Sequence, residues 1–404
     1  MVGQAANHCR TTCDDVPNLL SAFVGAFVDF SVTDGFVFPP PLSPSTVISP
    51  ADDLLSIPAR YPQPERLVAI GDVHGDLDKT KQALRLSGII DSSDRWCGGS
   101  ATVVQVGDVL DRGGEEIKIL YFLERLKVEA SMNGGNFITM NGNHEIMNVE
   151  GDFRYVTSSG LEEFKDWAFW YALGEKMKCL CGGLPKGKDL FEGIPSTFQG
   201  VKPEFYDGVR ARIAALKPNG PIAERFLSRN ATVAVVGESV FVHGGLLREH
   251  AEYGLERINN EVRDWIIGSN GSRTAPFYCR GRNSVVWLRK FSDEAATKCD
   301  CSALEHALAT IPGVKRMIMG HTIQEAGING VCEGKAIRVD VGMSRGCING
   351  LPEVLEITEN SGLRIITSNP IHRSDGNPSP TRRIVERRGI AIHPQLESIT
   401  VQVK

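Results

Sequence analysis

Several features typical of secreted, membrane-spanning and nucleic-acid-binding proteins are missing from this sequence. Ten cysteines in 404 residues are too few for a disulfide scaffold, so free thiols in a reducing compartment are expected. No run of uninterrupted apolar residues approaches the roughly 18 that a membrane-spanning helix needs. A formal net charge of -5 and a pI near 6.0 leave no excess of basic charge for nucleic acid or an anionic membrane. We therefore expect no nucleic-acid partner and no membrane insertion.

Signals for export and lipid attachment are also missing. The N-terminus, "MVGQAANHCRTTCDDVPNLL", has neither the basic start nor the apolar core of a signal peptide, and Val2 stands where N-myristoylation needs glycine. A cytoplasmic location is therefore expected. The C-x-x-x-C pair of Cys9 and Cys13 leaves the mitochondrial intermembrane space as the alternative, because such pairs are oxidised in that compartment.

The cysteines form three close pairs: Cys9 and Cys13, Cys179 and Cys181, and Cys299 and Cys301. A structural zinc site prefers two to four residues between paired thiolates, so the two C-x-C pairs fit zinc poorly. Ordinary packing as free thiols is the expected role, and a redox role is the alternative.

Composition divides the chain into three parts. Residues 1–64 contain the amphipathic stretch "VPNLLSAFVGAFVDFSV" and the proline-rich run "FPPPLSPSTVISP", which predict a short helix followed by an extended linker. This N-terminal arm either packs on the domain, which composition favours, or contacts a partner. Residues 65–368 are expected to form the main domain, and residues 369–404 a polar tail that ends in a further strand.

From residue 65, short β-branched runs stop at polar loops that contain glycine. "RLVAI" meets "GDVHGD", "ATVVQV" meets "GDVLDRGG", and "NFITM" meets "NGNHE", while "EEIKILYFLERLKVEA" has the pattern of an amphipathic helix. This order predicts a β-α-β-α-β unit of parallel strands. Because the carboxyl ends of parallel strands share one edge of a sheet, loops distant in sequence should converge there.

Later segments predict more strands. "ATVAVVGESVFVHGG" is typical of a hairpin that leads to His243, and "VKRMIMGHT" of a strand that ends at His321. "KAIRVDVGM" and "PEVLEITENSGLRIITS" predict further strands, which we expect to close a second sheet.

Five predicted strand ends carry polar side chains: Asp72 and His74, then Asp108 and Asp111, then Asn143 and His144, then His243, and finally His321. A single Gly-Asp after a strand is usually only a turn, and a single buried histidine is usually only hydrogen-bonded. Five such loops in one topology indicate a site instead. Oxygen and imidazole ligands without thiolate suit two divalent ions such as Mn, Fe or Zn, and one shared carboxylate would hold them close together.

These motifs resemble a known family. "GDVHGD", "GDVLDRG", "GNHE", "HGG" and "GHT", in this order over about residues 66 to 345, are similar to the phosphoprotein phosphatase branch of the calcineurin-like metallophosphoesterases. "GDVLDRG" with Leu110, "MGHTIQEAGI" and the "AFVDFSV" arm look most like the Shewanella-like protein phosphatases of plants. The resemblance implies an α/β fold in which a β-sandwich is flanked by helices in α/β/β/α layers. No "SAPNY" element is present, and "DVGMSRG" stands near its expected place.

The resemblance also implies the site residues. Asp72, His74 and Asp108 would hold one metal, and Asp108, Asn143, His243 and His321 the other. His144 would be the general acid that protonates the leaving oxygen, and Asp111 would orient it and raise its pKa. Arg112 would clamp the phosphoryl group, helped by a second arginine, for which Arg289 competes with Arg280 and Arg282.

The function expected from these residues is metal-dependent hydrolysis of a phosphomonoester, and the expected substrate is a protein phosphorylated at tyrosine or at serine and threonine. One alternative is a nucleotide or dinucleoside polyphosphate phosphoesterase, although those resemble "GNHD" more than "GNHE". Another alternative is an inactive scaffold that binds phosphopeptides. The aromatic insertion "FRYVTSSGLEEFKDWAFWYALGEKMKCLCGGLPKGK" either lines a wall for a tyrosyl ring or, as composition favours, is a helix packed on the core.

Overall fold

The structure is a computed structural model that describes residues 12–35, 56–180, 189–358, 362–368 and 381–383. Its α-helices are α1 Thr12–Val32, α2 Leu77–Leu86, α3 Glu116–Met132, α4 Asn143–Glu150, α5 Ser158–Leu180, α6 Tyr206–Leu216, α7 Pro221–Arg225, α8 Arg248–Tyr253, α9 Leu255–Ile266 and α10 Cys301–Ala309. Its strands are β1 Arg60–Tyr61, β2 Arg66–Ile70, β3 Thr102–Gln105, β4 Asn136–Thr139, β5 Val233–Val236, β6 Ser239–Val242, β7 Arg316–Met319, β8 Asn329–Val331, β9 Ala336–Arg338, β10 Glu353–Thr358, β11 Gly362–Thr367 and β12 Thr381–Arg383. The predicted β-α-β-α-β unit is present from β2 to β4.

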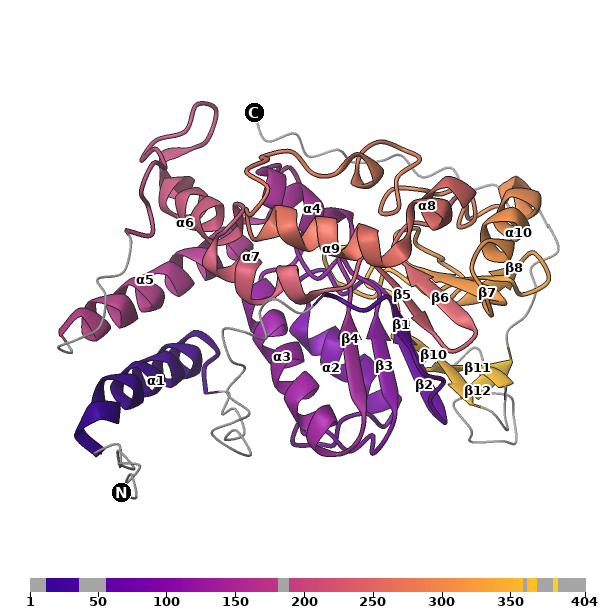
Figure 1. Cartoon of the computed structure of the whole chain (residues 1–404), viewed down its shortest axis with the longest axis horizontal. Coiled ribbons are helices and arrows are strands. Elements are labelled where there is room, and N and C mark those ends of the chain that lie inside the picture. The colour runs from indigo at the N-terminus through magenta and orange to yellow at the C-terminus, as the bar shows by residue number, and fades with distance from the viewer. Residues whose placement is uncertain (1–11, 36–55, 181–188, 359–361, 369–380, 384–404) are drawn as a thin grey trace, which may run out of the picture.

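Two mixed sheets form the centre of the molecule (Figure 1). The first has the strand order β12-β11-β10-β2-β3-β4, in which β2, β3 and β4 are parallel and β10 runs antiparallel to β2. The second has the order β1-β5-β6-β7-β9-β8, and the predicted hairpin is its antiparallel pair β5 and β6. The expected second sheet was therefore wrong in one respect: "KAIRVDVGM" supplies β9 to it, but "PEVLEITENSGLRIITS" forms β10 and β11 of the first sheet. The antiparallel pairing of β10 with β2 places these strands in the first sheet, and hydrophobic periodicity alone does not predict which strands pair.

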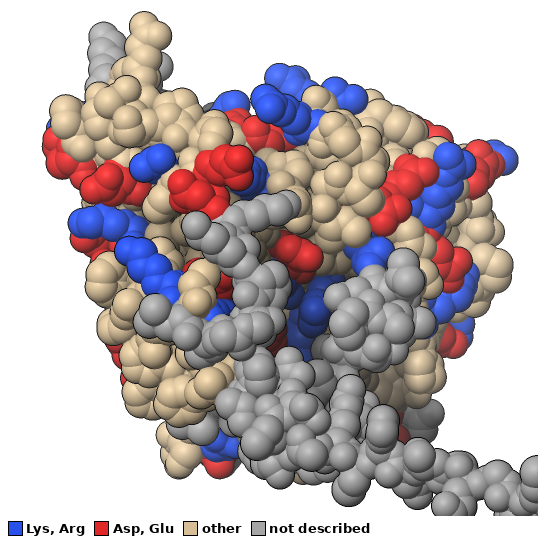
Figure 2. Space-filling model, turned by 60° about the vertical axis from the view of Figure 1, so that its left-hand side comes forward, with Lys and Arg blue, Asp and Glu red and all other residues tan. Residues whose placement is uncertain are grey.

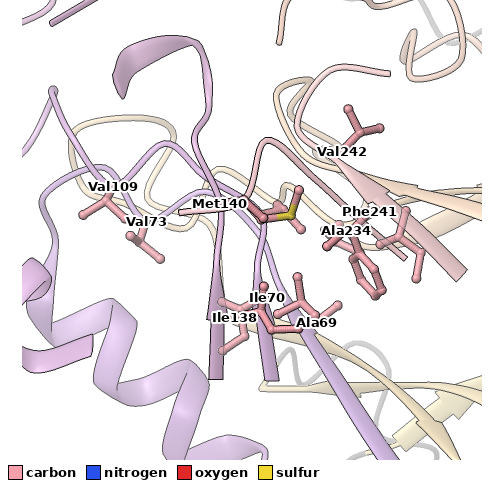
Figure 3. Close-up of a cluster of buried hydrophobic side chains, with 14 of the residues drawn as sticks. Ala69, Ile70, Val73, Val109, Ile138, Met140, Ala234, Phe241 and Val242 are labelled. Carbon is pink, nitrogen blue, oxygen red and sulfur yellow. The ribbon is translucent and has the colours of Figure 1, made fainter. Parts of the chain in front are cut away.

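The two sheets face each other across a shared core. Ile70, Ile138 and Met140 from the first sheet lie opposite Ala234 and Phe241 from the second (Figure 3), and all are buried. A backbone bridge between Met140 and Ala231 joins the sheets beside β4. Helices α2 and α3 cover the first sheet and α8, α9 and α10 lie beside the second (Figure 1), which gives the predicted α/β/β/α layers.

The aromatic insertion forms α5 and the loop before it. Phe164 and Trp167 are buried in the helical layer that α5 makes with α6, so packing is the main role of these aromatics. The N-terminal helix α1 packs on α5, as predicted: Val24 and Val28 are buried, and a Cβ on Gly174 of α5 would lie 2.5 Å from the Val28 side chain. The pair stands to one side of the sheets (Figure 1).

The expectation that all cysteines are free was wrong for one pair. A disulfide joins Cys301, at the start of α10, to Cys332 between β8 and β9, with a Cα–Cα distance of 5.3 Å. The sequence-adjacent partner Cys299 is a buried free thiol, and Cys179 is an exposed one. A contact across 31 residues depends on tertiary structure, and close spacing in the sequence does not indicate it. Cys9, Cys181 and the predicted C-terminal strand lie outside the described residues.

Basic and acidic side chains are mixed on the face of the molecule shown in Figure 2. Where chain is described, no helix is both long and apolar enough to span a bilayer.

Candidate active site

The predicted loops meet at the ends of strands from both sheets. A cavity of about 220 Å³ is lined by Asp72, His74, Asp108, Arg112, Asn143, His144, Tyr155, Trp287, Arg289, His321, Ile323, Asp340 and Cys347. Eight of these are predicted site residues, and the other two, Asp111 and His243, are fully buried just behind the wall. A larger groove between α4, α5, α6, α7 and α9 holds none of the predicted ligands. The convergence of loops at one edge, predicted from parallel topology, is confirmed.

Asp108 lies at the centre of this arrangement. Its Oδ2 atom is 3.2 Å from His243 Nε2, 3.7 Å from His74 Nε2 and 3.8 Å from His144 Nε2. Two groups of side chains have ligand atoms that all lie within 4.8 Å of one another: His74, Asp108 and His144, and Asp108, His243 and His321. Asp108 belongs to both, as a carboxylate that bridges two ions would.

The histidines are held in orientations that suit metal ligation. His74 Nδ1 lies 3.0 Å from the carbonyl oxygen of Leu110, and His243 Nδ1 lies 2.9 Å from that of Val106. A proton on each Nδ1 would leave the Nε2 lone pair directed at the centre, the usual tautomer of a liganding histidine. His321 Nε2 is buried and has no hydrogen-bond partner among the described residues. A buried nitrogen without a partner is costly, and a bound cation would satisfy it.

The electrostatics of the cavity also suit cations. Burial, together with the charges of Asp340 and Asp108, raises the pKa of Asp72 well above its usual value. Burial and the neighbouring His144 lower the pKa of His74 to about 3, so this imidazole is neutral and its lone pair is free to bind a metal. Burial opposes ionisation of Asp108, but His243 and His144 outweigh it and hold its pKa well below the usual range. Crowded carboxylates beside a neutral imidazole are the donor set of divalent ions.

Two of the predicted site residues, one expected ligand and the expected acid, differ from expectation in their membership of these two groups. Asp72 lines the cavity but lies outside both close groups, and its carboxylate accepts a hydrogen bond of 3.1 Å from the backbone N–H of His321. His144, expected to be the acid and not a ligand, lies inside one group. Asn143 Oδ1 is 3.0 Å from His243 Nε2, which places the amide oxygen at the same centre.

His144 and Asp111 form a buried pair. The Nδ1 atom of His144 lies 2.6 Å from Asp111 Oδ2, and both side chains are at most 3% exposed. Burial lowers the pKa of His144, but the charges of Asp108 and Asp111 outweigh it and give a net increase. This is the direction predicted from sequence. The arrangement allows His144 to carry a proton on the nitrogen that faces the cavity.

The two predicted arginines face the cavity. Arg112 lies with its guanidinium carbon 4.9 Å from the ring centroid of Tyr155, and its buried Nε has no hydrogen-bond partner in the described chain. Arg289 lines the cavity and donates from Nη1 to the backbone oxygen of His321 at 3.0 Å. The competing arginines, Arg280 and Arg282, are exposed and do not line the cavity. Planar donor forks beside a centre that can hold divalent cations are suited to a phosphoryl group.

Glu145 ties the loops together. Its buried carboxylate accepts hydrogen bonds from four backbone N–H groups, those of Gly142 at 2.7 Å, Val109 at 2.8 Å, Asp108 at 2.9 Å and Leu110 at 3.1 Å. Glu145 therefore supports the site at the start of α4 by holding the backbone of these loops. The loops need such support, because His74, Asp108, Asp111, Arg112 and His321 all have positive φ.

Two glycines are required because predicted ligands lie too close to their backbone for any side chain to fit. A Cβ on Gly142 would lie 2.2 Å from Asp108 Oδ1, and one on Gly320 would lie 2.3 Å from Asp72 Oδ1. Any side chain at either position would collide with a predicted ligand.

Five residues that line the cavity were not predicted as site residues: Tyr155, Trp287, Ile323, Asp340 and Cys347. Asp340 follows β9 and belongs to a sixth polar strand end, so the pattern in "KAIRVDVGM" contained a usable signal. Tyr155 lies in the loop between α4 and α5, with its ring centroid 5.0 Å from that of His144. The ring centroid of Trp287 is 5.5 Å from that of His321. Tyr155 belongs to the aromatic insertion, for which a wall against a tyrosyl ring was one of the two alternatives, whereas Trp287 was not singled out.

Comparisons with known proteins agree with this geometry. The calcineurin-like phosphoesterase family profile matches residues 65–325. Shewanella-like protein phosphatase 2 of Arabidopsis thaliana is 66% identical over 363 residues, which is 90% of each chain. Shewanella-like protein phosphatase 1 of Plasmodium berghei is 27% identical over 69% of this chain and 67% of that protein.

Among solved structures, the cold-active protein-tyrosine phosphatase of a psychrophilic Shewanella species has the same fold, with a TM-score of 0.53, 22% identity, and coverage of 78% of this chain and 81% of that chain. The chain belongs to the calcineurin-like phosphoesterase family and, within it, to the Shewanella-like protein phosphatases.

Proposed function

We propose that this protein is a metal-dependent protein phosphatase that hydrolyses phosphomonoesters. The observation that carries the proposal is the position of Asp108 in two ligand groups at once, beside an arginine fork and a His–Asp pair. Two divalent ions, with Mn, Fe or Zn as candidates, fit the donor set of Asp72, His74, Asp108, Asn143, His243 and His321. When bound, these ions supply positive charge for the phosphoryl group and make hydroxide available near neutral pH.

The side chains around the centre then have separate tasks. Arg112 and Arg289 bind the non-bridging phosphoryl oxygens. They hold the phosphoryl group so that water can attack phosphorus on the side opposite the leaving oxygen. As the bond from phosphorus to the leaving oxygen breaks, the proton on His144 passes to that oxygen, so that an alcohol or phenol departs. Asp111 holds the imidazole in place and stabilises its charged form. The products are inorganic phosphate and the dephosphorylated side chain.

For the substrate, we propose a preference for phosphotyrosine. Tyr155 lies at the cavity with 38% of its side chain exposed, and Trp287 also lines it. Two rings at the entrance offer apolar surface to the phenyl ring of tyrosine, which carries its phosphate farther from the backbone than serine does.

The test compares matched phosphotyrosyl and phosphoseryl peptides, first with metal-stripped protein and then after addition of Mn. Activity that returns with Mn and is greater on phosphotyrosine supports both parts of the proposal. Hydrolysis of a dinucleotide but of neither peptide would make the nucleotide phosphoesterase the better assignment. Metal binding without hydrolysis of any ester would leave the inactive scaffold.

For the location, we propose the mitochondrial intermembrane space rather than the cytosol, because stable disulfides such as Cys301–Cys332 form in oxidising compartments. Cell fractionation, with alkylation of thiols before and after reduction, tests this. A fully reduced protein in the cytosolic fraction would overturn it.

A further inference from the structure

Arg212 is a fully buried cation beside the candidate site. It lies in α6, within the helical layer between the "GNHE" and "HGG" motifs, and its side chain is fully buried. The guanidinium donates from Nε to Asn148 Oδ1 at 2.8 Å, and from Nη1 and Nη2 to the two carboxylate oxygens of Glu116 at 2.9 and 2.6 Å. It also donates from Nη2 to Asp111 Oδ1 at 2.8 Å. No motif in the sequence pointed to this residue.

The last of these bonds connects Arg212 to the His–Asp pair. Asp111 uses its two oxygens differently: Oδ1 accepts from Arg212 and from Asn148 Nδ2 at 3.0 Å, while Oδ2 faces His144 Nδ1 at 2.6 Å. The backbone N–H of Asp111 donates to Glu116 at 2.8 Å, so the same network holds main chain and side chain. Because Arg212 and Asn148 hold Oδ1, only Oδ2 of the Asp111 carboxylate can face the imidazole of His144.

Arg212 is itself held rigidly. Its guanidinium carbon lies 4.5 Å from the ring centroid of Phe164 and 5.7 Å from that of Phe153. Arg212 is also the cation that balances Asp111 and Glu116, two buried carboxylates whose side chains are completely inaccessible to solvent. Without it, mutual repulsion would favour movement of Asp111 away from its present orientation.

We propose that Arg212 is a positioning residue for the general acid: from outside the cavity, it fixes the orientation of Asp111 and so aims the His144 imidazole at the leaving oxygen. The inference rests on the proposed function, in which His144 donates the proton. It assigns a catalytic purpose to the helical layer formed by α5 and α6, which carries none of the family's motifs. Arg212 touches neither substrate nor metal ligand directly.

This role predicts a dependence on the leaving group. An acidic phenol departs as its anion and gains little from an aimed acid, whereas a weakly acidic phenol or an alcohol needs the proton. The experiment measures kcat/KM for phenyl phosphate, 2,4-dinitrophenyl phosphate and a phosphoseryl peptide with the Mn-loaded full chain. The variants are Arg212→Lys, which keeps the charge but not the fork, and the double variant Arg212→Met with Glu116→Gln, which removes a buried pair together and limits the loss of stability. Arg210→Met in the same helix is the control, since the Arg210 guanidinium lies over the ring of Phe191, whereas the Asp111 carboxylate is bonded by Arg212, Asn148 and His144.

We expect both Arg212 variants to lose about 10- to 100-fold on phenyl phosphate and on the peptide, but less than about threefold on 2,4-dinitrophenyl phosphate, with the smaller loss for lysine. Mn content and circular dichroism should match the wild type, and Arg210→Met should leave the ratio between substrates unchanged. In a His144→Asn background, Arg212→Lys should cost little more, because the two residues act as one unit.

Equal losses on all three substrates, or additive effects with His144→Asn, would overturn the role of Arg212 while leaving the phosphatase function intact. Failure of the wild type to hydrolyse any of the three with Mn would overturn both. If the double variant does not fold, Arg212→Lys with the same substrates decides the question.

Discussion

Replacement of Glu145 by glutamine probes how the metal-bearing loops are held in their strained conformation. The carboxylate is 1% exposed and accepts from the backbone N–H groups of Asp108, Val109, Leu110 and Gly142. Glutamine keeps one acceptor oxygen, so two of the four donors would face an NH₂ group instead. Each buried donor left without an acceptor costs about 1–3 kcal/mol, which gives about 2–6 kcal/mol in the free energy of unfolding.

One effect works in the opposite direction. Burial, and then the charge of Asp108, raises the pKa of Glu145, so removal of its charge relieves some repulsion. We therefore expect the lower part of the range, about 2–4 kcal/mol. Urea unfolding of metal-free protein, followed by tryptophan fluorescence, measures the loss of stability. The Mn content of Mn-loaded protein after dialysis should fall too, because Asp108 and Asn143 lie on the two loops that Glu145 joins.

A matched control is Glu129→Gln in α3. Glu129 is 5% exposed, accepts the backbone N–H of Trp96 at 2.8 Å and does not line the cavity. It also pairs with Arg95 and Arg125, so its replacement removes ion pairs as well. The Glu129→Gln variant should lose stability but keep its Mn content and its phosphatase activity. A Glu145→Gln protein that unfolds at the wild-type urea concentration, or that keeps its full Mn content and turnover, would refute the role assigned to Glu145.

Three further predictions follow from other contacts. His144→Asn should bind Mn as the wild type does but lose at least about 100-fold in turnover of phosphopeptides, because the proton donor is gone; full activity in the metal-loaded variant would remove His144 from that role. Glu163 accepts the N–H groups of Ile117 and Lys118 at 3.0 Å each, and burial with the Glu116 charge raises its pKa from 4.5 to about 8. The protonated form of Glu163 therefore stabilises the fold fully below pH 4.5, and this contribution is lost as the pH rises through 8. The thermal midpoint should decline between pH 4.5 and 8, and Glu163→Gln should make this decline smaller. An unchanged decline would contradict the raised pKa of Glu163. Gly174→Leu should displace α1 from α5, since a Cβ at position 174 would already lie 2.5 Å from the Val28 side chain. This variant should expose α1 to limited proteolysis, whereas Gly25→Ala should not, because a Cβ at position 25 meets nothing within 4 Å. Equal proteolysis of the two variants would argue against the α1–α5 contact.

The sequence by itself determined the parts of the protein that depend on local pattern. Strands at β2, β3 and β4, the helix α3, the hairpin of β5 and β6, and the five polar strand ends all follow from periodicity and turn residues. Parallel topology then predicted that the loops after β2, β3 and β4, which carry Asp72, Asp108 and Asn143, converge at one edge of the first sheet. The specificity of the ordered motifs supplied the family and the chemistry.

Tertiary structure decided the features that depend on contacts between distant segments. The pairing of β10 with β2, the bond between Cys301 and Cys332, and the choice of Arg289 over its neighbours arise from packing, which local pattern does not encode. The same holds for Tyr155 and Arg212, an exposed ring and a buried cation whose neighbours are set by how α5 and α6 pack. A side chain's type is written in the sequence, but its role depends on which atoms the fold brings within a few ångströms of it.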